Sequence, residues 1–247
     1  MVSFLLIGQS NMAGRGNPAE VEAIQNDRLY VLRNARFQKM YVPVNPDRKT
    51  SGTCLAESFA DSVSREYDAD VGLIPCADGG TRLDQWMPGE ALFENAVFQT
   101  QMARRVSEFA GILWHQGESD SRDGRHVSYE EKCLHIFAEL KKRLSLPEAF
   151  PILVGGIGDF ILRYQENKFK DYVFVNEALQ KMARENPGIA FVSAKGLTDK
   201  GDSLHFSAAS LREFGLRYFE SFQKVNTLLK KGETGIYIDK TTEMEKL

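Results

Sequence analysis

Short apolar segments alternate along the chain with longer segments whose apolar residues recur every three or four positions. The short segments are predicted to be strands, and they cover residues 3–8, 70–75, 111–115, 151–155 and 189–193. Their apolar residues are continuous rather than alternating, which is typical of strands that are covered on both faces of a parallel sheet. The pattern therefore predicts an α/β fold with a central, mainly parallel five-stranded sheet.

The longer segments carry apolar residues at the spacing of one helix face. The positions that show this spacing are Leu55, Phe59 and Val63; Tyr129, Cys133, Phe137 and Leu140; and Leu211, Phe214, Tyr218, Phe222, Val225 and Leu229. A further helix starts near Lys170 and is expected to stop at 186–188, where Asn, Pro and Gly follow one another. Residues 26–49 break the alternation, and strand-like segments at 29–32 and 42–46 predict an excursion or a small hairpin.

The length of 247 residues permits one α/β domain or two small ones. No repeat and no low-complexity linker divides the chain, so we expect one domain over residues 1–230. The polar tail at 231–247 is expected to be partly disordered or to add an edge strand.

Composition and charge narrow the class of partner. Hydrophobic residues make up 43% and charged residues 26% of the chain, which is ordinary globular usage. The net charge of −3 comes without a long run of either sign, so no nucleic-acid partner is expected.

No apolar stretch reaches the roughly 18 residues of a membrane span. The run at 4–7 is too short for a signal peptide, so we expect the chain as given to be cytoplasmic, although a precursor with a removed leader would look the same.

The cysteines give no sign of a disulfide framework or of a metal site. Cys54, Cys76 and Cys133 are an odd number at wide spacings, and no two of them form a CxxC pair. We expect them to be reduced and mostly buried. No HExxH or clustered His/Cys pattern is present, so no metal is expected.

Polar, glycine-rich segments follow the predicted strands. They occupy residues 8–14, 76–81 and 116–120, and a fourth polar segment at 202–205 precedes the last helix. In parallel α/β sheets the functional groups lie just beyond the carboxyl ends of the strands. These segments are therefore the candidates for a common site.

The four histidines differ in their surroundings. His126 and His135 lie among charged residues and are interpreted as solvated. His115 ends a buried strand, which favours a hydrogen-bonded core histidine over a direct catalytic role. His205 follows Asp202 by three residues, so the carboxylate can accept from one ring nitrogen and leave the other to act as a base.

Ser10 is the candidate nucleophile because it follows the first strand and has glycines on both sides. Amides there, together with the Gly80 N–H and the Gln116 side chain, would form an oxyanion hole. A helix cap at Ser10 and a simple turn at 79–80 are the alternatives. The GxSxG elbow of α/β-hydrolases is absent, and no dinucleotide or phosphate-binding loop is present.

Four strings carry a family resemblance, and they occur between residues 8 and 206. They are Gly8-Gln9-Ser10-Asn11-Met12, Gly79-Gly80-Thr81, Trp114-His115-Gln116-Gly117-Glu118-Ser119-Asp120 and Asp202-Ser203-Leu204-His205-Phe206. Together they resemble the SGNH hydrolase superfamily, and within it the branch of sialate O-acetylesterase-type and acetylxylan esterase-type carbohydrate esterases.

The resemblance implies a flavodoxin-like three-layer α/β/α sandwich and a serine esterase without a cofactor. It implies Ser10 as nucleophile, His205 as base and oxyanion donors at Ser10, Gly80 and Gln116, where Gln116 replaces the asparagine of the wider superfamily. Asp202 matches the DxxH arrangement and is preferred as the carboxylate that orients His205, while Glu118 is a competing or auxiliary partner.

The implied substrate is a small acetylated sugar or oligosaccharide. Trp86 is a candidate to stack on a sugar face, with ordinary packing as its alternative. Arg82 is a candidate to meet a substrate carboxylate or hydroxyls, with a solvated charge as its alternative. Two other functions stay open, namely a lysophospholipase or thioesterase of the same superfamily and a catalytically silent carbohydrate-binding relative. The oligomeric state is not predicted.

Overall fold

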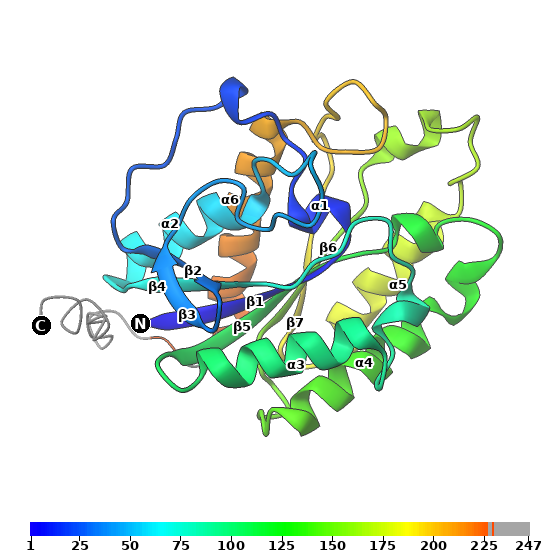
Figure 1. Ribbon diagram of the computed structural model, residues 1–247. Helices are drawn as coiled ribbons and strands as arrows, with labels where there is room; N and C mark the ends of the chain where they lie inside the picture. The colour runs from blue at the N-terminus through cyan, green and yellow to red at the C-terminus, as the bar shows by residue number, and fades with distance from the viewer. Residues whose placement is uncertain (227–228, 230–247) are drawn as a thin grey trace, which may run out of the picture.

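The computed structural model describes residues 1–226 and 229, and its centre is a seven-stranded sheet (Figure 1). The spatial order of the strands is β3-β2-β4-β1-β5-β6-β7, and every neighbouring pair is parallel except β2 and β3. The strands are β1 (Val2–Gly8), β2 (Leu29–Arg33), β3 (Arg36–Lys39), β4 (Val71–Pro75), β5 (Glu108–His115), β6 (Ile152–Gly155) and β7 (Ile189–Val192). The tail predicted at 231–247 lies outside the described residues.

The prediction of five strands is wrong, because β2 and β3 add an antiparallel hairpin to one edge of the sheet. All five predicted strands are present as β1, β4, β5, β6 and β7. The hairpin was expected at 26–49, but its second strand is Arg36–Lys39 and not the segment at 42–46. The edge strand β3 has Phe37 as its one buried residue, so it lacks the continuous apolar run of the central strands.

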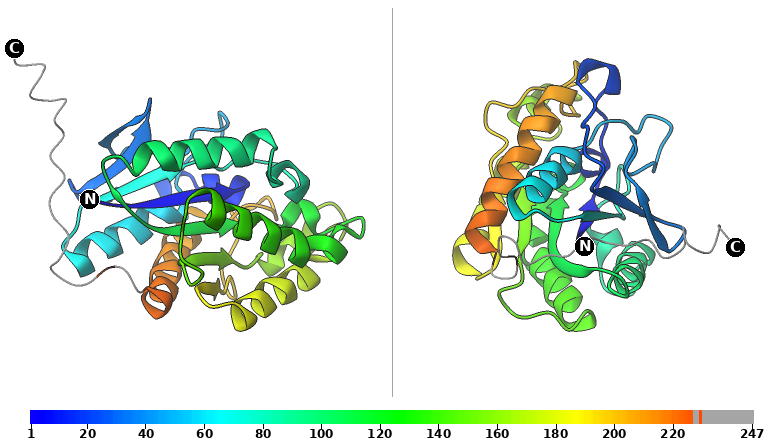
Figure 2. Two further views of the ribbon diagram at one scale, coloured as in Figure 1. Left: turned by 90° about the horizontal axis from the view of Figure 1, so that it is seen from below. Right: turned by 90° about the vertical axis from the view of Figure 1, so that its left-hand side faces the viewer.

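Helices cover both faces of the sheet (Figure 2). The α-helices are α1 (Ser10–Ala13), α2 (Leu55–Tyr67), α3 (Ala91–Ala103), α4 (Tyr129–Arg143), α5 (Tyr172–Glu185) and α6 (Ala208–Val225). Buried residues of α1, α2 and α6 pack on one face, and those of α3, α4 and α5 pack on the other. Short 3-10 helices are η1 (Pro18–Glu20), η2 (Leu83–Trp86), η3 (Glu118–Asp120), η4 (Arg125–Ser128) and η5 (Asp159–Arg163). The predicted three-layer sandwich is confirmed.

Strand β1 lies at the centre of both cores. Successive side chains of a strand point to opposite faces, and Phe4 accordingly packs into the α2 and α6 layer while Leu5 packs into the other. The Phe4 ring meets the rings of Phe59 and Phe222 edge-on, with centroids 4.9 and 5.2 Å away. Such edge-to-face contacts stabilise the packing beyond the area they bury.

Among the described residues, the helices α2, α4 and α6 follow the predicted one-face spacings, and α5 ends at Glu185, just before the predicted stop. Helix α3 was not predicted, because its apolar residues are not confined to one face: Phe93 is buried while Phe98 is exposed. The three cysteines are free and buried, as expected. Within the described residues, no helix combines the length and the hydrophobicity that a membrane crossing requires.

Candidate active site

Ser10 lies at the carboxyl end of β1 and is the first residue of α1 (Figure 1). The chain turns sharply before it, because Gly8 has a φ of 134° and lies against β5. A Cβ atom at position 8 would lie 2.0 Å from the carbonyl oxygen of His115, so only glycine fits there. The turn carries the Ser10 side chain to the edge of the sheet where the sequence predicted a common site.

His205 and Asp202 lie in the loop that joins β7 to α6. His205 Nε2 is 3.1 Å from Ser10 Oγ, and His205 Nδ1 is 2.7 Å from Asp202 Oδ2. The other carboxylate oxygen, Oδ1, accepts hydrogen bonds from the backbone N–H groups of Leu204 and His205, at 3.0 and 2.8 Å. Ser10, His205 and Asp202 therefore form one continuous line of polar contacts.

The pKa of Asp202 lies below its usual range. Burial by itself raises this pKa, but hydrogen bonds from the His205 N–H, the His205 ring and the Leu204 N–H outweigh the effect of burial. Asp202 is therefore ionised at neutral pH. Its carboxylate accepts a hydrogen bond from His205 when the proton of the imidazole is on Nδ1. That tautomer leaves the lone pair of His205 Nε2 facing the Ser10 hydroxyl.

Glu118 is buried beneath the same site and has other partners. Its Oε1 atom accepts from Asn11 Nδ2 at 2.5 Å and lies 3.2 Å from His115 Nε2. No hydrogen bond joins Glu118 to His205 among the described residues. Of the two competing carboxylates, Asp202 is thus the one that contacts His205. The buried His115, in contact with Glu118, matches the core histidine that the sequence favoured.

Two residues of the cavity at Ser10 carry a backbone N–H group that no described residue accepts. The N–H groups of Ser10 and Gly80 have no hydrogen-bond acceptor within residues 1–226 and 229. Gly80 has a φ of 79° and lines the same cavity as Ser10. The preceding N–H, that of Gly79, is occupied by Asp47 Oδ2 at 2.8 Å. Ser10 and Gly80, which the sequence predicted as oxyanion donors, thus line the same cavity, and their role as donors stays a prediction.

Gln116 does not reach the cavity at Ser10. Its side chain is 0% exposed and does not line the cavity at Ser10. The amide Nε2 donates to Asp120 Oδ2 at 2.5 Å, beneath the loop that contains Thr81. This arrangement contradicts the expectation that the Gln116 amide is available as an oxyanion donor, because a buried carboxylate already uses it.

Trp86 is also turned away from the cavity. It is 1% exposed, packs edge-on against Trp114 at 6.0 Å and donates through Nε1 to Thr81 Oγ1. The predicted stacking on a sugar is therefore wrong, since neither ring face reaches solvent. Arg82 is exposed but does not line the cavity at Ser10, so its contact with substrate stays a prediction.

The cavity at Ser10 has a volume of about 330 Å³ and is largely polar. Segments that are far apart in sequence form its walls. They contribute Gln9, Ser10, Arg15, Gly79, Gly80, Glu118, Ser119, Arg122, Tyr164, Gln165, Phe169, Leu204 and His205. A second cavity of about 390 Å³, lined by Leu32, Asn45 and Asn95 among others, contains neither Ser10 nor His205.

Gln9 is a cavity residue that sequence reasoning missed. It is 3% exposed, and its Oε1 atom accepts from the backbone N–H groups of Gly117 and Ser119 at 3.4 and 3.3 Å. These two donors fix the direction of the amide, so Nε2 is the free end. That nitrogen has no acceptor among the described residues and belongs to a side chain that lines the cavity. Its position next to Ser10 was the available signal.

Two arginines of the cavity were missed as well. Arg15 is buried and bonds Asp47 through both terminal nitrogens, at 3.0 and 2.7 Å. Arg122 makes longer contacts. Its guanidinium lies 5.1 Å from the centre of the Phe169 ring, and its Nε is 3.6 Å from Asp123 Oδ2. No local pattern marks either arginine as a cavity residue, because the other walls of the cavity come from distant segments of the chain.

No group of three or more His, Cys, Asp or Glu side chains is arranged to hold a metal ion in the part of the chain that the structure describes.

The family "Carbohydrate esterase, sialic acid-specific acetylesterase" matches residues 1–224. A probable carbohydrate esterase of Arabidopsis thaliana is 29% identical in an alignment 246 residues long, which covers 89% of this chain and 89% of that protein. An X-ray structure of a protein from the same plant is 26% identical, with a TM-score of 0.79, and the alignment covers 90% of this chain and 98% of that one.

The crystal structure of NanS is more distant in sequence but similar in fold. It is 18% identical, with a TM-score of 0.71, and the alignment covers 90% of this chain and 96% of NanS. At this identity the similarity describes the fold alone.

Proposed function

The chain belongs to the carbohydrate esterase, sialic acid-specific acetylesterase family, and we propose that it removes O-acetyl groups from carbohydrates with Ser10, His205 and Asp202 as its triad. The observation that carries this proposal is the unbroken contact from Asp202 through His205 to Ser10, at 2.7 and 3.1 Å. We further propose that residues 1–230 form the esterase domain.

In the first step the hydroxyl of Ser10 attacks the carbonyl carbon of the acetyl ester. His205 Nε2 takes the serine proton as the Oγ–C bond forms, and Asp202 stabilises the resulting imidazolium. The tetrahedral intermediate then collapses, the bond from the acyl carbon to the sugar oxygen breaks, and the sugar leaves as an alcohol with the proton from His205.

In the second step water replaces the sugar. His205 Nε2 takes a proton from the water as its oxygen attacks the acetyl group on Ser10. Collapse of the second tetrahedral intermediate breaks the bond to Ser10 Oγ, which recovers its proton from His205, and acetate leaves. These steps need no cofactor, and Ser10 and His205, which exchange the proton, both line the cavity.

The negative oxygen of each tetrahedral intermediate is proposed to bind the N–H groups of Ser10 and Gly80 and the amide Nε2 of Gln9. The absence of an acceptor for these donors within the described residues supports this assignment. Donors that are fixed before the reaction stabilise the charge without reorganisation. Gln9 thus takes the role for which the sequence had favoured Gln116.

The proposed substrate is an acetylated sugar that carries a carboxylate, as sialic acid does. Arg122 supports this choice, because its ion pair with the exposed Asp123 is long, at 3.6 Å, whereas Arg15 is held by the buried side chain of Asp47 at 2.7 Å. A guanidinium held against an aromatic ring is well suited to bind a carboxylate. The polar lining of the cavity does not favour the long acyl chain of a lysophospholipase substrate.

A comparison of acyl lengths tests the proposed function. We expect kcat/KM for p-nitrophenyl acetate to exceed that for p-nitrophenyl octanoate by about 10² or more, because the pocket accommodates a short acyl group. Release of acetate from O-acetylated sialic acid, measured by an enzymatic acetate assay, tests the sugar. Faster hydrolysis of the octanoate ester would point to a lipase, and no hydrolysis of any ester would point to a binding protein.

A further inference from the structure

Asn11 connects the nucleophile to the loop that carries the base. It follows Ser10 in α1 and is buried. Its Oδ1 atom accepts from the backbone N–H of Phe206 at 3.1 Å, and its Nδ2 atom donates to the carbonyl oxygen of Leu204 at 3.1 Å. The second hydrogen of Nδ2 points to Glu118 Oε1, 2.5 Å away.

We propose that Asn11 is a positioning residue that holds His205 against Ser10, and that Glu118 acts through Asn11 by fixing the direction of its amide. The inference rests on the proposed esterase function, in which Ser10 and His205 exchange a proton. Neither Asn11 nor Glu118 touches the reacting atoms in this account.

The two backbone contacts of Asn11 hold the chain on both sides of the base. Leu204 and Phe206 are the immediate neighbours of His205, so the two bonds to Asn11 fix the peptide units that flank the imidazole. Because Asn11 and Ser10 are consecutive in one helical turn, the same short element sets the position of the nucleophile. The contact of 3.1 Å between His205 Nε2 and Ser10 Oγ is therefore set by one rigid connection.

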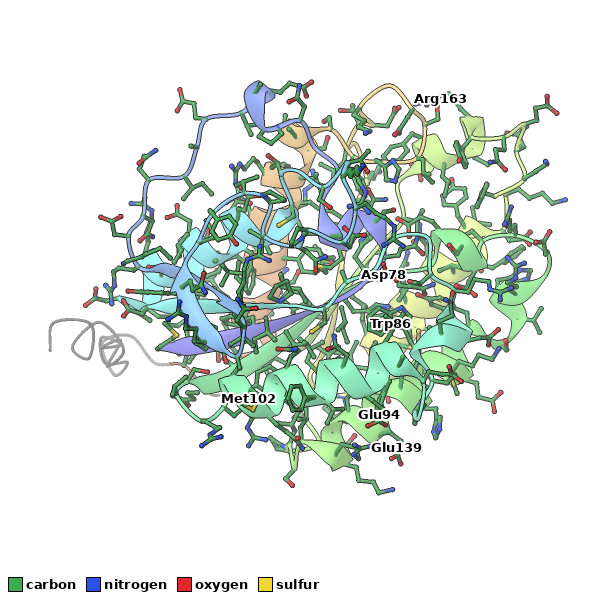
Figure 3. All side chains as sticks on the ribbon, viewed as in Figure 1. Asp78, Trp86, Glu94, Met102, Glu139 and Arg163 are labelled. Atoms are coloured by element: carbon green, nitrogen blue, oxygen red, sulfur yellow. The ribbon has the colours of Figure 1, made fainter. Side chains whose placement is uncertain are left out.

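Other bonds hold the loop internally or to different elements. The N–H of Lys200 donates to the carbonyl oxygen of His205 at 2.9 Å, within the loop itself. Arg163, labelled in Figure 3, donates to Asp199 at 2.7 Å and so ties the loop to η5. These contacts stabilise the loop but do not connect it to the helix that carries Ser10.

Glu118 gives the Asn11 amide its direction. Burial raises the pKa of Glu118, but the charge of His115 and hydrogen bonds from His115 and Asn11 outweigh burial and hold that pKa below its usual range. The carboxylate can then only accept hydrogen bonds, so the amide must turn Nδ2 toward it. Oδ1 is thereby left for the N–H of Phe206, as observed.

A pair of amide-carboxylate exchanges tests the inference. Asn11→Asp places a carboxylate against the carboxylate of Glu118, which displaces the loop that holds His205. We expect kcat for p-nitrophenyl acetate to fall about 10² because a catalytic group is then misplaced, while KM stays within about threefold of wild type. Glu118→Gln alone is expected to lower kcat about tenfold, the size of effect seen for outer partners of a site. In the variant that carries both substitutions, the amide introduced at position 118 can donate to the carboxylate introduced at position 11. Its kcat should therefore recover about tenfold over Asn11→Asp.

Asn176→Asp is the matched control. Asn176 binds the backbone N–H and carbonyl oxygen of Ile157 through the same pair of amide contacts, at 2.8 and 3.0 Å, but holds no part of the His205 loop. We expect kcat within about threefold of wild type in this variant, whatever its effect on thermal unfolding. Equal losses of kcat in Asn11→Asp and Asn176→Asp would overturn the inference, as would a double variant less active than Asn11→Asp.

A proton NMR measurement distinguishes a failure of this inference from a failure of the proposed function. The hydrogen-bonded proton on His205 Nδ1 should give a low-field proton resonance that is absent in His205→Ala. We expect this resonance to broaden through exchange with water in Asn11→Asp and to return in the double variant. An unchanged resonance in Asn11→Asp would overturn the inference. A wild type that shows the resonance but hydrolyses no ester would instead overturn the proposed function.

Discussion

Gln9 and Gln116 follow the carboxyl ends of two neighbouring strands, β1 and β5, yet only the side chain of Gln9 lines the cavity at Ser10. The Gln9 amide lines the cavity at Ser10, with its nitrogen free. The Gln116 amide is buried and donates to Asp120. The end of a strand therefore determines which residues are near the site, while the partners supplied by other loops determine which side chains face it.

The largest expected effect concerns Ser10, the proposed nucleophile, which follows Gln9 in the chain. Ser10→Ala should lower kcat for acetyl esters by about 10⁴ or more, because among the described residues the hydroxyl in contact with His205 Nε2 is that of Ser10. Steady-state kinetics measure the loss, and circular dichroism checks that the fold is kept. Retention of about a tenth of the wild-type kcat would contradict the assignment of Ser10.

The second expected effect compares the two carboxylates. Asp202→Asn should lower kcat by about 10³ to 10⁴, because an amide no longer stabilises the imidazolium of His205. Glu118→Gln should cost only about tenfold, since Glu118 acts through Asn11. The two variants are assayed side by side with p-nitrophenyl acetate. A greater loss in folded Glu118→Gln would require a triad of Ser10, His205 and Glu118.

The third expected effect separates the two glutamines directly. Gln9→Glu keeps an acceptor for the N–H groups of Gly117 and Ser119 but replaces the free donor by a carboxylate oxygen, so kcat should fall about 10² or more. Its thermal stability should change little. Gln116→Ala should leave kcat within about threefold and lower the free energy of unfolding by about 1–3 kcal/mol, because buried Asp120 loses a donor. The reverse pattern would restore Gln116 as the oxyanion donor.

The smallest expected effect concerns substrate selection. Arg122→Gln should raise KM for an O-acetylated sugar acid about tenfold and leave KM for p-nitrophenyl acetate unchanged, because only the sugar acid has a carboxylate to bind. Arg82→Gln is the matched control, since Arg82 is an exposed arginine outside the cavity. Equal effects of the two substitutions would show that general surface charge and not Arg122 attracts the substrate.

Continuous apolar runs predicted the central strands well, because a strand buried on both faces has little freedom in composition. The edge hairpin of β2 and β3 was only partly predicted, since its residues are divided between core and solvent. The spacing of Asp202 and His205 predicted their contact because three residues of one loop suffice to form it.

The direction of side chains in the loops could not be predicted in the same way. Trp86 and Gln116 are turned inward by Thr81 and Asp120, which are partners in the surrounding loops. Arg15 is fixed by Asp47, 32 residues away. Such contacts depend on how the strand-end loops pack together, and that packing is not encoded in any local period of the sequence.

The most direct test of the account is to identify the nucleophile by a covalent label. The protein is treated with diethyl p-nitrophenyl phosphate, which transfers a phosphoryl group to an activated serine, and its peptides are analysed by mass spectrometry. We predict one diethyl phosphate group on the peptide that contains Ser10, formed in parallel with the loss of acetyl esterase activity and absent in Ser10→Ala. Inactivation with the label on another residue, or equal labelling of Ser10→Ala, would contradict the assignment of Ser10 as the nucleophile.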